Sequence, residues 1–592
     1  MAKEHRAVVE LMWNMISRKT GSISRVSYFP QKPEFPQPDG KETHFLRTAP
    51  ESEGVSSGML ASMIEDLAVR ERGDIHQLMV LRNGRVLCEC SFSPYQRGVW
   101  HITHSMCKSV TGMAVGLLIS EGKLSLDDSV AEIFGKRRNI LGLFKKKNIT
   151  VKHLLTMSSG VVFNESGAVS GDEWVKGYLE SSIHGTPGKS FEYNSMNSYI
   201  LSAIITEITG ETMMDYLKPR LWEPLGITRV FWECCPQGIT KGGWGLFLRT
   251  EDAAKLGQLY LQKGEWDGRQ IIPVEWVEAS TTKWMDTPEE LEAFGYGYQV
   301  WMDARPGSFN FNGMLGQNVL VYPDMNMVVA INAGSDDFFQ SGALKDVISE
   351  YFHLNYMPED ILPENGREYR RLCSVIRKME DRTLNLPVIE RGGWKKRKGS
   401  DFSFQRKYMG SLNGCRYALA QRQVGIAPLV MQVFHNNFTD GIHSIGFMIR
   451  ERKLLVKISE GETEHVFPIG FEKPEFSQIE IHQEPYLIGV KGVFATDEDG
   501  RLVLKLDIAF LEEAVRRKLK IFFEGNRIEI HWDETPGEKM ILNGLESITA
   551  DAQNHFIINN LKERGAMEVL KIAAELTIKP VTFGEKTQTE LE

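Results

Sequence analysis

The residues Ser105-Met106-Cys107-Lys108 decide how this chain is interpreted, because they place a nucleophile and an amine one helical turn apart. After them, apolar residues recur at helical spacing until a glycine stops the run: Met106, Val110, Met113, Ala114, Leu117, Leu118 and then Gly122. We expect Ser105 in the first helical turn, where unpaired N–H groups and the helix dipole favour an alkoxide or an oxyanion. Lys108, three residues later, shares the face of Ser105.

The Ser-x-x-Lys pattern needs context, because the chain contains it three times. The copy at Ser120 falls at the end of the same helix, and the copy at Ser280 ends an apolar run. Neither opens a buried helix, and a serine and a lysine on the surface explain both copies. Ser105 and Lys108 are therefore the candidate pair, since a lysine can take a serine proton when burial or nearby cations depress its pKa.

A second polar stretch, Tyr193-Asn194-Ser195, precedes another apolar helical run that ends at Gly210. A phenol near a lysine cation ionises more readily and can relay the serine proton to a leaving group. The alternative is a loop tyrosine beside a helix cap. In the first interpretation Tyr193 is a second base, and Ser195 supports it by hydrogen bonding.

With these two motifs in this order, the chain resembles the superfamily of penicillin-binding proteins and class C beta-lactamases, which are serine hydrolases. Further likenesses span about residues 46 to 356: the stretch 153–160 (HLLTMSSG), Gly242-Gly243-Trp244-Gly245-Leu246, the stretch 253–266, Phe294-Gly295-Tyr296-Gly297-Tyr298, and Gly313-Met314-Leu315-Gly316-Gln317. The resemblance implies an α/β (α+β) fold, in which an antiparallel sheet is flanked by helices and a helical lobe closes the active site. It also implies an acyl-enzyme on Ser105.

The chain departs from the family at its third motif, a Lys-Thr-Gly or His-x-Gly on the strand beside the active site. Lys19-Thr20-Gly21 precedes the nucleophile, and Lys241-Gly242-Gly243 precedes a helical segment, so we reject both. The position that fits is Phe311-Asn312-Gly313, which lacks the cation that binds a substrate carboxylate in the family. Turnover of beta-lactams is therefore not expected.

The resemblance assigns the oxyanion hole to the backbone N–H groups of Ser105 and Met314, with Gly313 and Asn312 lining the substrate side. Backbone donors need close approach, which glycine permits. The glycines alternatively mark a strand against which a helix packs closely. His101 and His104 lie beside the nucleophile, but no Gly-x-Ser-x-Gly elbow surrounds Ser105, so we do not expect a catalytic histidine.

Length and composition exclude several other classes of protein. The 592 residues, 42% of them hydrophobic and 25% charged, are typical of globular domains, and a net charge of −9 argues against a nucleic-acid partner. Seven cysteines without paired spacing indicate neither a disulfide framework nor a zinc site, and we expect no metal and no cofactor. The apolar run from Val8 to Ile16 is interrupted and resembles no signal peptide, so we expect a cytoplasmic protein without a membrane partner.

We expect four segments: an N-terminal extension over residues 1–45, a catalytic domain over 46–356, a linker over 357–400, and a β-rich domain over 401–592. In the catalytic domain, Asn83-Gly84 predicts a hairpin between 77 and 92, and strands are expected at 296–301, 318–322 and 327–332, followed by a helix at 341–352. The last domain has apolar or alternating runs at 429–434, 442–449, 454–458, 502–508 and 519–523, and a closing helix is expected at 551–575.

The leading hypothesis is a serine hydrolase that cleaves an ester or amide bond through an acyl-enzyme on Ser105. Lys108 is the base for acylation, and Tyr193 protonates the leaving group. A small ester, a D-amino-acid peptide and a linear oligoamide all remain open as substrates. The alternative is a beta-lactamase-like binding or assembly protein with little turnover, and a third option is a true beta-lactamase or D,D-carboxypeptidase.

Overall fold

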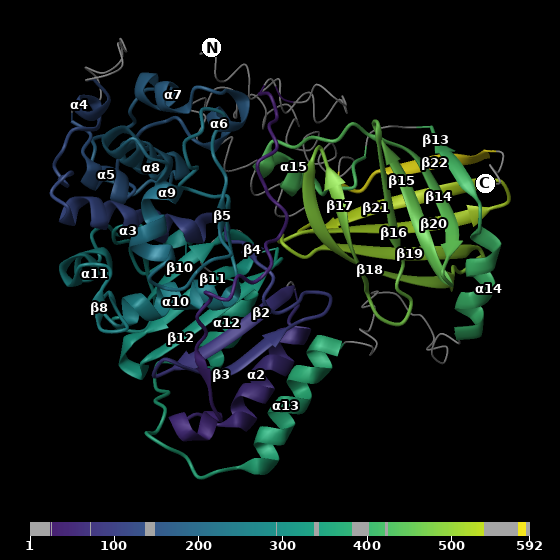
Figure 1. Cartoon of the computed structure of the whole chain (residues 1–592), viewed down its shortest axis with the longest axis horizontal. Coiled ribbons are helices and arrows are strands. Elements are labelled where there is room, and N and C mark those ends of the chain that lie inside the picture. The colour runs from purple at the N-terminus through teal and green to yellow at the C-terminus, as the bar shows by residue number, and fades with distance from the viewer. Residues whose placement is uncertain are drawn as a thin grey trace. The chain divides into compact units, whose positions relative to one another are not determined.

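The computed structural model describes residues 24, 26–71, 73–135, 148–291, 293–336, 342–381, 402–420, 424–537 and 578–587. The chain forms two compact units, each with its own core. The first comprises residues 25–91 and 97–376, and the second comprises 92–96 and 377–592, apart from short N-terminal pieces. Figure 1 labels the elements of both units. The expected closing helix at 551–575 lies outside the described residues.

A seven-stranded sheet forms the centre of the first unit. In sheet order its strands are β1 (Leu46–Arg47), β3 (Arg85–Ser91), β2 (Ile75–Arg82), β12 (Met327–Ala333), β11 (Gln317–Tyr322), β10 (Phe309–Gly313) and β9 (Trp301–Met302). All neighbours pair antiparallel except β1 and β3. Strands from the start and the end of the unit therefore meet as β2 and β12 in the middle of the sheet, which confirms the expected antiparallel sheet and the hairpin around Asn83-Gly84.

Helices of the first unit include a lobe built around α8, which contacts α3, α4, α5, α7 and α9 (Figure 1). The helices are α2 (Ser57–Val69), α3 (Cys107–Ser120), α4 (Val130–Gly135), α5 (Val151–Leu155), α6 (Glu165–Ser170), α7 (Trp174–Glu180), α8 (Ser195–Thr209), α9 (Met213–Leu217), α10 (Thr250–Leu261), α11 (Val274–Ser280), α12 (Ala343–Tyr351) and α13 (Gly366–Asp381). Helix α10 packs on β2, β11 and β12, and α12 packs on α2. Helices thus cover a face of the sheet, and the helical lobe lies beside the sheet.

Two small sheets complete the unit: β4 (His101–Ile102), β6 (Leu246–Leu248) and β5 (Phe231–Trp232) in one, and β7 (Glu265–Trp266) and β8 (Arg269–Gln270) in the other. The expected strand over 296–301 is wrong for most of its length. Gly295 and Gln299 have φ of 126° and 61°, which breaks the extended backbone, and only Trp301–Met302 join the sheet as β9. Tyr296 makes isolated bridges to Met285 and Trp301.

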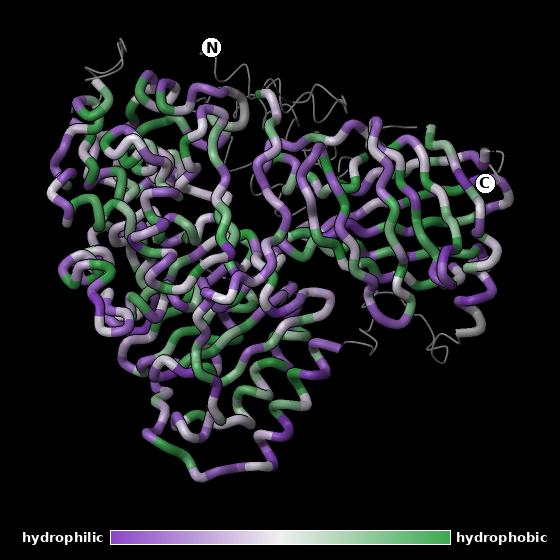
Figure 2. Tube along the Cα trace, viewed as in Figure 1, coloured by the Kyte–Doolittle hydropathy of each residue, from purple (hydrophilic) through white to green (hydrophobic). Residues whose placement is uncertain are grey.

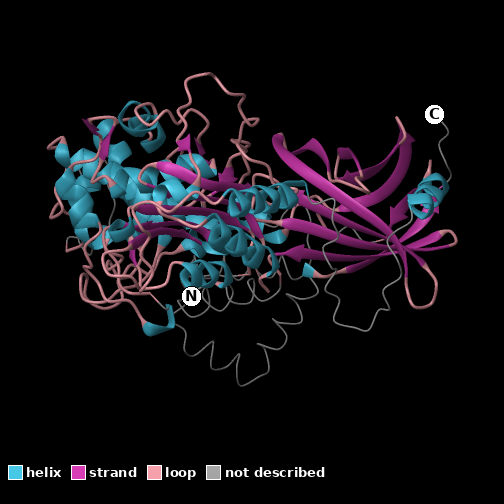
Figure 3. Cartoon of the chain, turned by 90° about the horizontal axis from the view of Figure 1, so that it is seen from below, coloured by secondary structure: helices cyan, strands magenta, loops and turns pink. Residues whose placement is uncertain are grey.

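The second unit is a ten-stranded antiparallel sheet (Figure 3). In sheet order its strands are β16 (Thr463–Pro468), β15 (Lys453–Glu460), β14 (Ile442–Arg450), β13 (Arg416–Leu419), β22 (Val581–Thr587), β21 (Arg527–Thr535), β20 (Arg516–Glu524), β19 (Leu502–Phe510), β18 (Glu484–Thr496) and β17 (Glu475–Ile481). The two edge strands, β16 and β17, contact each other, so the sheet curls into a near-barrel. Hydrophobic and hydrophilic residues alternate along its strands (Figure 2), because successive side chains face the core and the solvent in turn. The β-rich prediction is confirmed.

In the described part of this unit, the helices include α14 (Phe402–Leu412) and α15 (Leu429–His435). The expectation of a strand at 429–434 is wrong, because a short apolar run does not by itself separate a helix from a strand. Pro428 precedes the first turn, where proline is favoured, and Asn436, with φ 53°, ends the helix in the left-handed conformation.

Buried titratable groups line the interior near α15. Glu460 accepts hydrogen bonds from the backbone N–H of Ile426 (2.9 Å) and from the hydroxyl of Thr439. Burial raises the pKa of Glu460, and burial lowers the pKa of nearby His465 to about 4. The charged forms of both groups are therefore disfavoured in the folded state.

Glu460→Gln is expected to gain stability relative to the wild type as the pH rises from 5 to 8. A carboxyl whose pKa is raised by folding stabilises the fold while it is protonated, and that stability is lost as the pH rises through the folded pKa. Glutamine stays neutral, and its carbonyl oxygen accepts from Ile426 N–H while its amide nitrogen donates to the Thr439 hydroxyl. Thermal unfolding at both pH values measures the difference, with the exposed Glu464→Gln on β16 as the control. A pH-independent difference between Glu460→Gln and the wild type would contradict the argument.

Candidate active site

The nucleophile candidate, Ser105, lies in a tight turn that follows strand β4. The N–H and the hydroxyl of Thr103 both donate to Leu246 O at 2.8 Å, which anchors the end of β4 to β6. His104 then has a φ of 46°, and residues 104–106 form a 3-10 turn before α3 begins at Cys107. Ser105 is thus in the turn that leads into the helix, which corrects the expectation of the first α-helical turn. The strained His104 backbone gives the turn its sharp direction.

Burial makes Ser105 distinctive in this stretch. From Val99 to Leu118 every residue is buried except Ser105, which is half-exposed. The serine hydroxyl is therefore the one point at which this part of the chain presents a reactive group to a substrate. Cys107 is not a competing nucleophile, because burial raises the pKa of its thiol to about 12.

The Lys108 amine has two hydrogen-bond partners, Ser105 Oγ at 2.7 Å and Gly243 O at 2.8 Å. Its side chain is 2% exposed. The amine donates to both oxygens, which holds its nitrogen within direct proton-transfer distance of the serine hydroxyl. The arrangement therefore suits proton transfer from Ser105 to Lys108.

The glycine pair Gly242-Gly243 holds this amine in place and was not assigned a role from the sequence. A Cβ on Gly243 would lie 2.8 Å from Ser195 O, so only glycine allows the chain to pass this close to α8. Gly242 O accepts from Thr111 Oγ1 at 2.7 Å, which ties the same segment to α3. The only signal in the sequence was the doubled glycine itself. Lys241, which we rejected as the third motif, is buried in an ion pair with Glu233 at 2.8 Å.

Tyr193 lies beside the lysine, with the Lys108 amine 5.0 Å from the centroid of its ring. The next residue, Asn194, caps α8: its side chain accepts from Met196 N at 2.8 Å and donates to Val161 O and Phe163 O, both at 2.9 Å. These bonds fix the backbone on which Tyr193 sits. The tyrosine is half-buried.

Ser195, the predicted supporting residue, begins α8. Its backbone N–H donates to Glu165 Oε1 at 3.1 Å. Within the described ranges, its hydroxyl makes no hydrogen bond to Lys108 or Tyr193. Its backbone lies against Gly243, and the carbonyl of Gly243 accepts from Lys108. Ser195 is therefore linked to the lysine through Gly243.

Strand β10 approaches the serine turn through Gly313. A Cβ on Gly313 would collide with Thr103 O and would lie 3.0 Å from Met106 N. The half-exposed Met314 follows in a turn that contains Leu315 at φ 65° and Gly316 at φ 89°. The backbone of the predicted oxyanion residues Ser105 and Met314 therefore belongs to two segments in close contact.

The other predicted residue of this strand, Asn312, donates through Nδ2 to Asn318 Oδ1 at 2.7 Å. Asn312 is buried, and an amide stands in the strand where the family carries a cation. Phe311 packs its ring against Tyr260 of α10, with centroids 5.2 Å apart, and is therefore a core residue.

Gln299 holds the helices around the site together, although no role was expected for it from the sequence. Its side chain donates to Leu154 O (3.1 Å) and Leu155 O (3.0 Å) on α5 and accepts from Ser198 of α8. Its backbone carbonyl accepts from Ser109 Oγ of α3 at 2.7 Å. Through its side chain and its backbone carbonyl, the buried residue Gln299 thus joins the three helices that carry or support the candidate catalytic residues.

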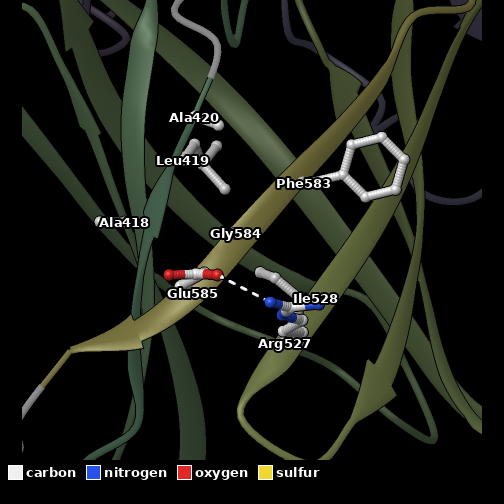
Figure 4. A pocket seen from close by; sticks show the side chains of 8 residues that line it. All are labelled: Ala418, Leu419, Ala420, Arg527, Ile528, Phe583, Gly584 and Glu585. Atoms are coloured by element: carbon white, nitrogen blue, oxygen red, sulfur yellow. Dashed lines mark ion pairs between the residues drawn. The ribbon is translucent and has the colours of Figure 1, made fainter.

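A pocket in the second unit offers no comparable chemistry (Figure 4). Its volume is about 420 Å³, and it is lined by Ala418, Leu419, Ala420, Arg527, Ile528, Phe583, Gly584 and Glu585. Arg527 and Glu585 form an ion pair at 3.3 Å, and no serine or cysteine lines it. Among the described residues, no group of three His, Cys, Asp or Glu side chains has a metal-binding arrangement. None of the helices in the described ranges is both long and apolar enough to span a bilayer.

Comparison with known proteins shows the family to which the chain belongs. The chain is 25% identical over 327 residues to 6-aminohexanoate-dimer hydrolase of Paenarthrobacter ureafaciens, which covers 49% of this chain and 82% of the relative. It is 30% identical over 132 residues to Protein flp of Staphylococcus aureus (strain COL), but this match spans 26% of that protein's length and 21% of this chain.

Among solved structures, the octameric penicillin-binding protein homologue from Pyrococcus abyssi superposes with a TM-score of 0.41 at 19% identity, covering 80% of this chain and 99% of the other. The beta-lactamase family pattern matches residues 38–346, which is 309 of the 592 residues. The chain therefore belongs to the beta-lactamase family.

Proposed function

We propose that this protein is a serine hydrolase that cleaves an ester or amide bond through an acyl-enzyme on Ser105. The observation that carries the proposal is the hydrogen bond of 2.7 Å between the buried Lys108 amine and the half-exposed Ser105 hydroxyl. A surface serine and lysine would not be held in this way. The membership of the chain in the beta-lactamase family and its similarity to 6-aminohexanoate-dimer hydrolase support the same conclusion.

In the proposed reaction, Ser105 Oγ attacks the substrate carbonyl while Lys108 takes its proton. The tetrahedral oxyanion is bound by the backbone N–H groups of Ser105 and Met314. Tyr193 passes a proton to the leaving alcohol or amine, and it then helps water to attack the acyl-enzyme and release the acid.

Two alternatives are weaker. A binding or assembly protein with little turnover would not need the amine to be held against the serine, although the altered third motif is consistent with it. A beta-lactamase or D,D-carboxypeptidase would use a cation in the third motif, where this chain has Asn312 bonded to Asn318.

Intact mass spectrometry after treatment with a fluorophosphonate is the direct test. We expect one adduct on the wild type and none on Ser105→Ala, with Ser105-dependent turnover of a chromogenic short-chain ester and little or no turnover of a cephalosporin. The Cys107→Ala variant is a matched control at the neighbouring nucleophile and should retain the adduct. An equal response of wild type and Ser105→Ala would favour the binding-protein alternative.

Tyr193→Phe removes only the hydroxyl and keeps the ring beside Lys108. Because general acid–base groups contribute about 100-fold to 10,000-fold, kcat/KM on an alkyl ester should fall by a factor within that range. We compare kcat/KM because it reports acylation and excludes the later role of Tyr193 in deacylation. A p-nitrophenyl ester should be affected less, because its leaving group needs no proton. Equal losses on the two esters would argue against Tyr193 as the acid.

Gly313→Ala should lower kcat by about 100-fold or more, because the added methyl group separates β10 from the serine turn and weakens the oxyanion hole. The thermal midpoint should be recorded in parallel to separate misfolding from lost catalysis. Gly410→Ala is the matched control, since a Cβ there meets no atom within 4 Å. Unchanged ester turnover in a folded Gly313→Ala protein would rule out this location for the oxyanion hole.

A further inference from the structure

An apolar cluster lies against Tyr193 on the side of the helical lobe. Its buried members are Met157, Tyr296 and Trp301, and the half-exposed side chains packed on them are Phe191, Tyr193, Met285, Leu291 and Ala293. We call these eight residues the Tyr193 cluster. The ring centroids of Tyr193 and Trp301 are 5.4 Å apart, and the Tyr296 and Trp301 rings meet edge to face at 4.7 Å.

The cluster is part of the surface as well as of the core. Three members are almost fully buried and form its floor, while the other five are half-exposed. One of those five is Tyr193, and the centroid of its ring lies 5.0 Å from the Lys108 amine. A partly open apolar wall that includes a candidate acid–base group is typical of a small-molecule site.

The surroundings of the cluster disfavour a negative charge. None of the eight side chains is ionised at neutral pH in its usual state. The nearby cations are already engaged. The Lys108 amine bonds to Ser105 and Gly243, Lys152 lies 4.2 Å over the Trp284 ring, and Lys283 pairs with Asp286 at 2.5 Å. Two carboxylates, Glu165 and Glu192, flank the tyrosine motif, the first bonded to Ser195 N.

The third motif, Phe311-Asn312-Gly313, is uncharged and also disfavours a carboxylate on the substrate. Asn312 offers an amide already bonded to Asn318. A carboxylate on the substrate would lose water here without gaining an ion pair, whereas an alkyl chain would gain by leaving water.

We propose that the Tyr193 cluster is the pocket for the leaving group and that it selects uncharged, apolar alcohols or amines over those that carry a carboxylate. This inference rests on the proposed function, in which Tyr193 protonates the leaving group, because whatever packs on the Tyr193 ring then lies beside that group. It adds a substrate class to the proposed chemistry: neutral esters and amides with an apolar leaving group.

The test compares hexyl acetate with 6-acetoxyhexanoate, which differ only at the far end of the leaving group. In both, Ser105 Oγ bonds to the acetyl carbon, the bond to the alcohol oxygen breaks, and the serine proton ends on that oxygen. Water then releases acetate from the same acetyl-enzyme. Since deacylation is identical, the ratio of kcat/KM values reports on the leaving-group pocket alone.

We expect kcat/KM for hexyl acetate to exceed that for 6-acetoxyhexanoate by about tenfold or more. The reason is that placing one unpaired charge in a partly solvated apolar site is unfavourable by about that factor. Met285→Lys should raise the relative kcat/KM of the carboxylate ester by about fivefold, because the half-exposed lysine can direct its amine along the cluster. Met285→Gln has similar length without charge and should change the ratio much less than Met285→Lys does. Met448→Lys, on an exposed position of β14 in the second unit, controls for net charge.

Each outcome is decisive. A wild-type ratio near one, or a preference for the carboxylate ester, with turnover that Ser105→Ala abolishes, overturns the pocket and leaves the hydrolase intact. Turnover of neither ester, combined with no fluorophosphonate adduct on Ser105, overturns the proposed function and the pocket with it. The wild-type ratio needs no variant, so poor folding of Met285→Lys does not remove the test.

Discussion

The placement of the Lys108 amine is the constraint on which the rest of the site depends. A buried amine must find acceptors, and this one has Ser105 Oγ and Gly243 O. The second acceptor requires a backbone carbonyl deep between α3 and α8, and only a residue without a side chain can bring it there. The double glycine, the capped start of α8 and the contacts of Gln299 with three helices all serve the same geometry.

On the β10 side of the site, close approach of the backbone again requires a glycine. Gly313 lets β10 touch the serine turn, where a larger residue would meet Thr103 O. The two walls together hold Ser105 as the single half-exposed residue in a long buried stretch. On the β10 side of this centre, the position expected to carry a cation holds the amide of Asn312, which is bonded to Asn318.

The second unit is organised differently from the first. Its strands alternate hydrophobic and hydrophilic residues around a near-barrel, and several carboxyl and imidazole groups are buried with backbone partners near α15. Such groups specify one arrangement of a short helix and its loops, since an unpaired carboxyl would be costly. Among the described residues that line its pocket, none is a serine or a cysteine.

From the sequence alone, periodicity and turn residues predicted the hairpin at Asn83-Gly84, the catalytic helix, the late strands β11 and β12 and the β-rich second unit, because these signals are local. They failed where local signals are ambiguous: the run at 429–434 is a helix, and the stretch at 296–301 is broken by positive φ angles. The sequence also determined which side chains are candidates for catalysis, since Ser105 and Lys108 are one helical turn apart. Only the tertiary structure decided what surrounds them. The carbonyl of Gly243, the aromatic wall beside Tyr193 and the burial of Phe311 all come from segments distant in the chain, and their effects depend on close approach in space.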